Sequence, residues 1–454
     1  MSFAAETRTL FDRLADECFA SCAAGEEVTL SLSAEDQTYL RFNASRLRQS
    51  TEVRQRDLSV QFQSGGRRVD LGFSLGGDFA TDVRALRSAI ERARAETRVL
   101  PEDPFLVPME NRGASEVSHP GRLLGTQEAI RIFTEATGGT EFTGLYAAGP
   151  MLRASRNSRG QSHWFDTESF FIDYSLYTVN AAGENKAVKE CYADNAWSEA
   201  KFLAGLRGAR ERLAQLRKPS LALQPGGYRA YLAPAAARDF AGMLGWGALS
   251  YSAWKRGLSA LARLQEGAAT LSPRLSLREN FALGLAPQFN ALGEMAPADL
   301  PLIERGELRN LLVGARSARE YGVPSNGAEE DPFVGEAPRS PEIAGGELDE
   351  AQALERLDTG VYLGNLHYLN WSDRHSARVT GMTRYACFWV ERGEIAAPMR
   401  DLRFDESLYR ALGGNLEALT RETHVLPETG TYYCRSLGGM KVPGLLIDDF
   451  RFTL

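Results

Sequence analysis

The sequence predicts an α+β protein with an N-terminal α/β domain and a β-rich C-terminal domain. At 454 residues the chain exceeds the size, about 250 to 300 residues, at which a single hydrophobic core stops growing. The first half contains two cycles of a helix, alternating strands and a closing helix, whereas the second half consists mainly of strand patterns. We therefore place the N-terminal domain at residues 1–218 and the C-terminal domain at residues 228–454.

The first cycle covers about residues 1–100. Apolar residues at helical spacing predict amphipathic helices over residues 5–22 and 81–98. Between them, three runs alternate between apolar and polar residues, as strands do: Val28–Leu32, Leu58–Phe62 and Val69–Phe73. We expect an antiparallel meander with one polar face, in which Gly65-Gly66 forms a hairpin turn.

The second cycle covers about residues 120–218 and follows a Pro-rich connector. It is predicted to hold a helix over Thr126–Ala136, strands up to Val179 and a closing helix over Glu199–Arg217. Four residues of each cycle match at one constant spacing: Leu40, Leu47, Arg48 and Ser50 with Leu145, Leu152, Arg153 and Ser155. Together with the shared element order, this match predicts that the two cycles are a duplicated unit.

The second half begins after a Pro- and Gly-rich boundary, Lys218–Gly227. We expect helices over Pro234–Leu264, a long mobile loop over Gly322–Asp349 and a helical turn at Leu416–Arg421. Strand patterns fill most of the remainder: Tyr228–Leu232, Gly360–Leu369, Ser376–Val379, Tyr385–Val390, Glu394–Met399 and the stretch that ends at Leu454.

Composition excludes two classes of partner. The formal net charge is −7, so neither nucleic acid nor an anionic membrane surface is an expected partner. No run of 18 apolar residues and no secretory signal pattern is found. Five scattered cysteines do not form a disulfide framework, and we expect a cytoplasmic protein.

The sequence contains no complete catalytic motif. Zinc peptidases need two imidazoles one helical turn apart beside a carboxylate, and none of the five histidines has that spacing. The histidines closest in sequence, His367 and His375, could meet in a hairpin, but polar packing explains them better. Cys18 and Cys22 share a helical face without a second ligand pair, which favours core packing. Nucleophile-elbow, P-loop and dinucleotide-binding patterns are also missing.

Three segments carry a family resemblance. "TGMTRYACFWVERGEIAAPMRDLRF", Thr380–Phe404, followed by Gly414-Asn415-Leu416, resembles the C-terminal signature of the TldD/PmbA family. "YLAPAAARDFAGMLGWGALSYSAWKRGLSAL", Tyr231–Leu261, resembles the strand and helix of the PmbA-type (TldE-type) members, and the ending "YYCRSLGGMKVPGLLIDDFRFTL" resembles the family terminus. Cys434 stands where the peptidase-type members have a metal-binding cysteine.

The departures from the family pattern bear on function. TldD-type members carry His-Glu-x-x-x-His, and the corresponding residues here are Arg238, Asp239 and Met243. Arginine has no free lone pair for zinc, and a methionine thioether is too soft to replace imidazole. A family motif "FDdEG" is also altered, because "NAL" (290–292) precedes the turn at Gly293. The resemblance therefore implies a member without the zinc motif, with no catalytic residue and no metal of its own.

The resemblance implies a non-catalytic subunit that pairs with a zinc-bearing TldD-type partner to process or degrade unstructured peptides. Within the C-terminal signature we expect Thr380, Gly381, Arg384 and Tyr385 to contact the peptide, which could bind by strand addition. Two alternatives remain open. One is a stand-alone homodimeric peptide-binding or scaffolding protein without enzymatic role, and the other is an enzyme that uses Asp373, His375 and Cys434 in a new site.

Overall fold

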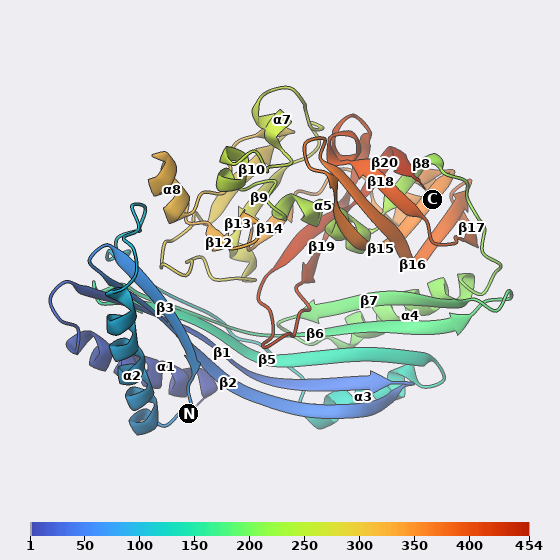
Figure 1. The fold of residues 1–454 in the computed structure, drawn as a ribbon. Helices are drawn as coiled ribbons and strands as arrows, with labels where there is room; N and C mark the ends of the chain where they lie inside the picture. The colour runs from blue at the N-terminus through green and yellow to red at the C-terminus, as the bar shows by residue number, and fades with distance from the viewer. Residues whose placement is uncertain (1, 454) are drawn as a thin grey trace.

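The computed structural model describes residues 2–453 and shows two layers of β-sheet. The first half of the chain forms a long, curved seven-stranded sheet, and the second half forms an eleven-stranded sheet above it (Figure 1). This architecture confirms the predicted α+β class, with an N-terminal domain and a β-rich C-terminal domain. Among the helices of residues 2–453, none combines the length and the apolar character that crossing a membrane requires.

The N-terminal layer repeats one element order, a helix, three antiparallel strands and a helix. The first copy consists of α1 (Phe3–Ala20), β1 (Glu26–Asn43), β2 (Arg46–Ser64), β3 (Arg67–Ser74) and α2 (Phe79–Thr97). The short strand β4 (Ala114–His119) precedes the second copy, which consists of α3 (Thr126–Thr137), β5 (Glu141–Asn157), β6 (Ser162–Val179), β7 (Asn185–Asp194) and α4 (Glu199–Gln215). The helices agree with the predicted ones, whereas several strands are far longer.

The two copies meet at the centre of the sheet, where β1 and β5 pair antiparallel. From there the strands follow the order β3-β2-β1-β5-β6, and β4 and β7 pair with different parts of β6. The residue match that supported duplication was wrong. Residues 40–50 cross the turn between β1 and β2, whereas residues 145–155 lie wholly inside β5. The repeat therefore exists in the element order, and the short match joined residues that are not equivalent.

Helices cover the face of this sheet that points away from the C-terminal layer. In Figure 1, α1, α2 and α3 lie beneath the strands. Apolar side chains of α1 and α2 pack on β1, β2 and β3, and those of α3 and α4 pack on β5, β6 and β7. The second of these clusters continues into the C-terminal layer through Ala386 and Phe388, so one core region joins the two layers.

The C-terminal layer contains short helices and many strands. Its helical elements are α5 (Pro234–Gly242), η1 (Met243–Gly245), α6 (Tyr251–Lys255), α7 (Ala262–Gln265), η2 (Phe281–Leu283), α8 (Ala315–Tyr321), η3 (Glu350–Gln352), α9 (Ala353–Leu357) and η4 (Arg410–Gly414). Its strands are β8 (Gly226–Leu232), β9 (Leu277–Asn280), β10 (Asp299–Glu304), β11 (Glu307–Leu308), β12 (Glu329–Asp331), β13 (Gly335–Ala337), β14 (Pro341–Ile343), β15 (Gly360–Asp373), β16 (Arg378–Glu391), β17 (Glu394–Pro398), β18 (Arg403–Ser407), β19 (Leu416–Pro427) and β20 (Gly439–Phe452).

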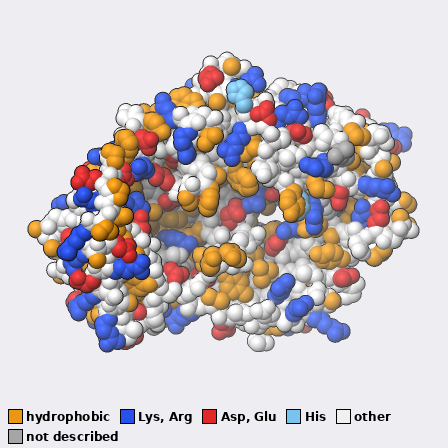
Figure 2. Space-filling model, viewed as in Figure 1, with side chains coloured by type: hydrophobic (Ala, Val, Ile, Leu, Met, Phe, Trp, Pro, Cys, Tyr) orange, Lys and Arg blue, Asp and Glu red, His pale blue; other side chains and the backbone are white. Residues whose placement is uncertain are grey.

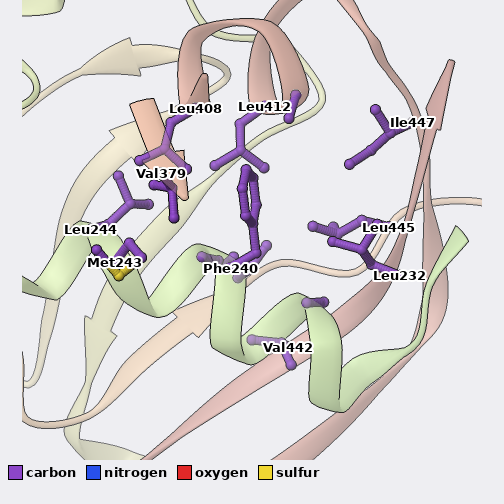
Figure 3. Close-up of a cluster of buried hydrophobic side chains, with 14 of the residues drawn as sticks. Leu232, Phe240, Met243, Leu244, Val379, Leu408, Leu412, Val442, Leu445 and Ile447 are labelled. Atoms are coloured by element: carbon purple, nitrogen blue, oxygen red, sulfur yellow. The ribbon is translucent and has the colours of Figure 1, made fainter. Parts of the chain in front are cut away.

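Five of these strands close into a ring around a packed core. The pairings run β20-β18-β16-β15-β8, and β8 pairs back to β20. Helix α5 supplies the centre of this core, because Phe240 is fully buried and its ring lies 6.4 Å from that of Phe404 and 5.5 Å from that of Phe450. Figure 3 shows Phe240 pointing into the cluster, with Met243 and Leu244 following on the same segment.

Two predictions for this half were wrong, and a third is confirmed only in part. The expected helical turn at Leu416–Arg421 is instead the start of β19, in which Leu416 and Leu419 pair with β20. The prediction failed because register shifts in β19 disturb the alternation of apolar and polar residues that marks a strand. The expected mobile loop over Gly322–Asp349 contains β12, β13 and β14, and β14 lies between β9 and β20 in the large sheet. The expected helices over Pro234–Leu264 are interrupted, with only short helical segments after Gly242.

Candidate functional site

A groove lies between the two layers and consists of three adjoining hollows. The central hollow has a volume of about 990 Å³ and is lined by residues of β5, α5, the β12–β13 turn and the β19–β20 loop. The β7 hollow, about 660 Å³, shares Arg238 and Asp239 with it, and the β1–β2 hollow, about 600 Å³, shares Arg153 and Pro287 with it. Figure 2 shows this face hollowed between the layers, with charged and apolar side chains around the opening. We call the three together the interlayer groove.

Helix α5 presents two charged side chains to the groove. Pro234 at its first turn and the alanines that follow favour a helix, and its other face is buried in the core. Arg238 forms an ion pair with Glu428 of the β19–β20 loop, and a guanidinium nitrogen of Arg238 lies 3.9 Å from Asp239 Oδ1. Burial raises the pKa of Asp239 to about 6, although its Oδ2 accepts a hydrogen bond from the backbone N–H of Leu366 at 3.3 Å.

The third residue of the altered motif, Met243, lies in η1 directly after α5. Its side chain is only 2% exposed and belongs to the core cluster, and part of it reaches the wall of the central hollow. A guanidinium already paired with a carboxylate, one aspartate and a buried thioether do not form the donor set of a zinc ion. Within residues 2–453, no three His, Cys, Asp or Glu side chains converge as metal ligands would.

Cys434 lies in the loop between β19 and β20, which descends from the C-terminal layer to the N-terminal sheet (Figure 1). The next residue, Arg435, fixes the loop there: its side chain donates to Ser169 O at 2.6 Å and to Gln37 Oε1 at 3.2 Å. The Cys434 side chain contacts Arg153 of β5, and burial raises the pKa of its thiol. Cys434 is therefore a neutral thiol beside Arg153, which lines the groove.

The four residues expected to contact peptide are placed differently from one another. Thr380 and Gly381 lie inside β16, where β15 occupies one edge and β18 the other, so no free strand edge exists at these two residues. The absence of a side chain at Gly381 is a packing requirement, since a Cβ atom there would lie 2.5 Å from Phe404. Tyr385 lines the β7 hollow, and the guanidinium of Arg384 lies over its ring at 5.2 Å.

Other residues singled out in the sequence have structural roles. Asp373 accepts a hydrogen bond from the backbone N–H of His375 at 3.0 Å and so shapes the exposed β15–β16 turn. His367 lines the β7 hollow beside Tyr385. Asn290 accepts backbone hydrogen bonds from Leu292 and Glu294 and closes the turn at Gly293. Cys18 is buried in the core between α1 and the N-terminal sheet, and Cys22 packs against that core.

A comparison with known protein families shows to which family the chain belongs. Residues 225–454, just over half of the sequence, match the family described as PmbA/TldA metallopeptidase C-terminal domain. The chain belongs to the PmbA/TldD family. A comparison with curated proteins finds no match to this sequence.

Solved structures of similar fold extend the PmbA/TldD comparison over the N-terminal layer. TldE from Thermococcus kodakarensis has 12% sequence identity and a TM-score of 0.79, with 98% of this chain and 100% of that chain covered. A Thermotoga maritima protein described as a proposed modulator of a DNA gyrase has 17% identity and a TM-score of 0.77, with 98% and 100% covered. A Bacteroides thetaiotaomicron protein described in similar terms has 15% identity and a TM-score of 0.77, with 99% of both chains covered. At these identities the likeness shows a shared fold.

The structure also brings residues to the groove of this PmbA/TldD chain that the sequence did not single out as site residues. Arg153 of β5, Arg339 before β14 and Glu428 of the β19–β20 loop all line the central hollow. No local motif marks them, because they come from three segments far apart in the chain. Among these, Arg153 appeared in the sequence only as part of the repeat match.

Proposed function

We propose that this chain is a non-catalytic, PmbA/TldE-like subunit that binds unstructured peptide for a zinc-bearing TldD-type partner. The observation that carries the proposal is the interlayer groove, in which three hollows adjoin one another between the layers. An elongated groove fits an extended chain better than a compact small molecule, which takes a single enclosed pocket.

The lining of the groove suits a peptide of mixed sequence. Trp246 and Phe333 are 50% and 90% exposed at the central hollow, and they could cover apolar side chains. Arg238 and Asp239 offer charge of both signs at the junction with the β7 hollow. Because both edges of β16 are paired at Thr380 and Gly381, we assign peptide contact to these lining side chains and to Tyr385, without strand addition at β16.

The non-catalytic part of the proposal is supported by α5. The side chains that correspond to the family zinc motif are an arginine paired with Glu428 and an aspartate on α5, and a core methionine in the following η1. We therefore assign zinc and the cleavage of the peptide bond to the partner. All five cysteines are free thiols, which agrees with our further proposal that the complex works in the cytoplasm.

Metal analysis and peptidase assays test this function. We expect the purified chain to hold less than stoichiometric zinc and to leave an unfolded peptide intact. Co-expression with a family member that carries His-Glu-x-x-x-His should give a complex with zinc and with activity that a chelator removes. Cleavage by the chain alone with stoichiometric zinc would overturn the proposal. Self-association without any gain of activity on mixing would favour the stand-alone peptide-binding protein.

A further inference from the structure

Three arginines line the central hollow, and two of them are held in place by contacts with the protein. Arg238 is held by Glu428 and lies beside Asp239. Arg339 donates to main-chain carbonyl oxygens of two segments, at Pro287 (3.1 Å) and Phe289 (2.7 Å) in one and at Gly327 (2.9 Å) in the other. These two side chains therefore support the walls of the hollow.

The third arginine, Arg153, lies on the floor of the groove, toward the C-terminal end of β5. Its neighbours Leu152 and Ala154 point into the core on the helix side of the sheet, so the alternation of the strand turns Arg153 toward the groove. Its guanidinium donates to the carbonyl oxygen of Leu152 at 2.8 Å and contacts the thiol of Cys434. Both partners are uncharged, since burial raises the pKa of the Cys434 thiol.

The carboxylates nearest to Arg153 are occupied by other donors. Glu35 accepts hydrogen bonds from Gln55 Nε2 at 2.7 Å and from the backbone N–H of Arg435 at 2.8 Å. Asp57 accepts from the hydroxyl of Ser74 at 2.7 Å. Both carboxylates favour the charged form of Arg153, but desolvation by the surrounding protein is the larger effect and lowers its pKa.

A guanidinium in this position is suited to an anionic ligand. Arginine presents five N–H donors in a planar fork that matches a carboxylate, and most of the Arg153 donors are left without a protein acceptor. A desolvated charge that forms no direct ion pair is unfavourable, and an incoming anion would reduce that cost. The side chain opens into both the central hollow and the β1–β2 hollow, and serines of β1, β2 and β5 stand around it in the latter.

We propose that Arg153 is an anchor for a carboxylate of the bound peptide, either its C-terminal carboxylate or an Asp or Glu side chain. This inference rests on the proposed peptide-binding function and adds a recognition rule to it. A peptide would bind in the interlayer groove with one of its carboxylates next to Arg153, on the part of the floor that β5 forms between β1 and β6. Arg153 is thus a binding residue, and it takes no part in chemistry.

Binding of three labelled unstructured peptides, measured by fluorescence anisotropy, tests the anchor. The first has a free C-terminal carboxylate and no acidic side chain, the second an amidated C-terminus and one glutamate, and the third an amidated C-terminus and glutamine in its place. We expect one or both acidic peptides to bind about tenfold or more tighter than the third. In Arg153→Gln this preference should disappear, and in Arg153→Lys it should be reduced, while Arg48→Gln on the exposed surface of β2 keeps it.

The possible outcomes separate the two proposals. If no peptide binds, the proposed function fails and the anchor fails with it. If all three peptides bind equally, or if Arg153→Gln keeps the preference while its thermal unfolding matches the wild-type chain, only the anchor is overturned. If Arg153→Gln does not fold, Arg153→Lys decides, because it retains the charge and loses the planar fork.

Cys434 provides a second measurement on the unaltered protein. Arg153 favours the thiolate form of Cys434, so a carboxylate that neutralises the guanidinium should slow alkylation of this thiol by neutral iodoacetamide. Mass spectrometry should show slower modification of Cys434 with the acidic peptides than with the neutral one, with Cys22 at the end of α1 unchanged. Equal rates at saturating peptide would overturn the location of the anchor.

Discussion

At the scale of single residues, Asp239 shows how burial changes the acidity of one carboxyl group. The sequence predicted that Arg238, Asp239 and Met243 could not hold zinc, and the donor types alone were enough for that argument. It did not predict that Arg238 would pair with Glu428, because 190 residues separate them. Nor could it predict how strongly Asp239 is buried, since burial depends on the segments that pack around α5.

Replacing Asp239 with asparagine should make the protein more stable at pH 8 and leave its stability unchanged near pH 4. Burial raises the folded pKa of Asp239 from an ordinary 3.8 to about 6. Between these values the folded chain holds a proton that the unfolded chain has released, so wild-type stability falls as pH rises through this window. The gain for Asp239→Asn at pH 8 is expected to approach about 2 to 3 kcal/mol in urea unfolding.

Asp373→Asn is the contrasting control for this pH dependence. Hydrogen bonds within its exposed turn lower the pKa of Asp373, so its replacement should not stabilise the protein at pH 8. A flat difference between Asp239→Asn and wild type from pH 4 to pH 8 would show that Asp239 is not desolvated as described.

At the scale of elements, the sequence predicted regular segments well and irregular ones poorly. Residues 5–22 and 199–217 have clean helical periodicity, and α1 and α4 appear there. Leu416 and Leu419 are three residues apart, the spacing of residues on one face of a helix. Both nevertheless lie in β19, where a register shift allows their side chains to enter the same core. Gly322–Asp349 has the composition of a loop, yet Glu336 accepts a hydrogen bond from Ser252 at 2.8 Å and fixes β13 beside α6. Such long-range contacts leave no local pattern.

Gly381→Ala should destabilise β16 by about 1 to 3 kcal/mol, because its Cβ atom would overlap the Phe404 ring inside the closed core. Urea unfolding measures this cost. Gly414→Ala is the matched control, since open space surrounds that position and little change is expected. If Gly381→Ala weakens peptide binding while its unfolding curve stays that of the wild type, Gly381 is a peptide contact, as the family signature suggested, and the packing explanation is wrong.

At the scale of the whole molecule, the interlayer groove is the feature that no stretch of sequence could predict. Its lining comes from both layers, and its depth depends on how they sit on one another. Beyond the shared core at Ala386 and Phe388, the contacts between the layers include the ion pairs Arg112–Glu294 and Arg316–Asp103 and the hydrogen bonds of the β19–β20 loop. The Arg435 side chain is 3% exposed there, and desolvation lowers its pKa to about 10.

Arg435→Ala should weaken the attachment of the β19–β20 loop to the N-terminal sheet. The change removes hydrogen bonds to Ser169 and leaves the buried amide of Gln37 without this donor, so a loss of about 2 to 3 kcal/mol is expected in urea unfolding. The loop should also become sensitive to limited proteolysis. Tyr432→Ala changes an 82% exposed side chain of the same loop and should do neither. Equal protease resistance of Arg435→Ala and wild type would show that the loop is held by other contacts.

The ion pair of Arg238 with Glu428 has a consequence for how the groove responds to its surroundings. The positive charge that pairs with Glu428 is part of the Arg238 side chain, so its presence does not depend on the concentration of any free ion. Because this positive charge cannot dissociate, removal of metal ions should leave the shape and the charge of the groove unchanged. The thermal stability of this protein should accordingly be the same with and without EDTA.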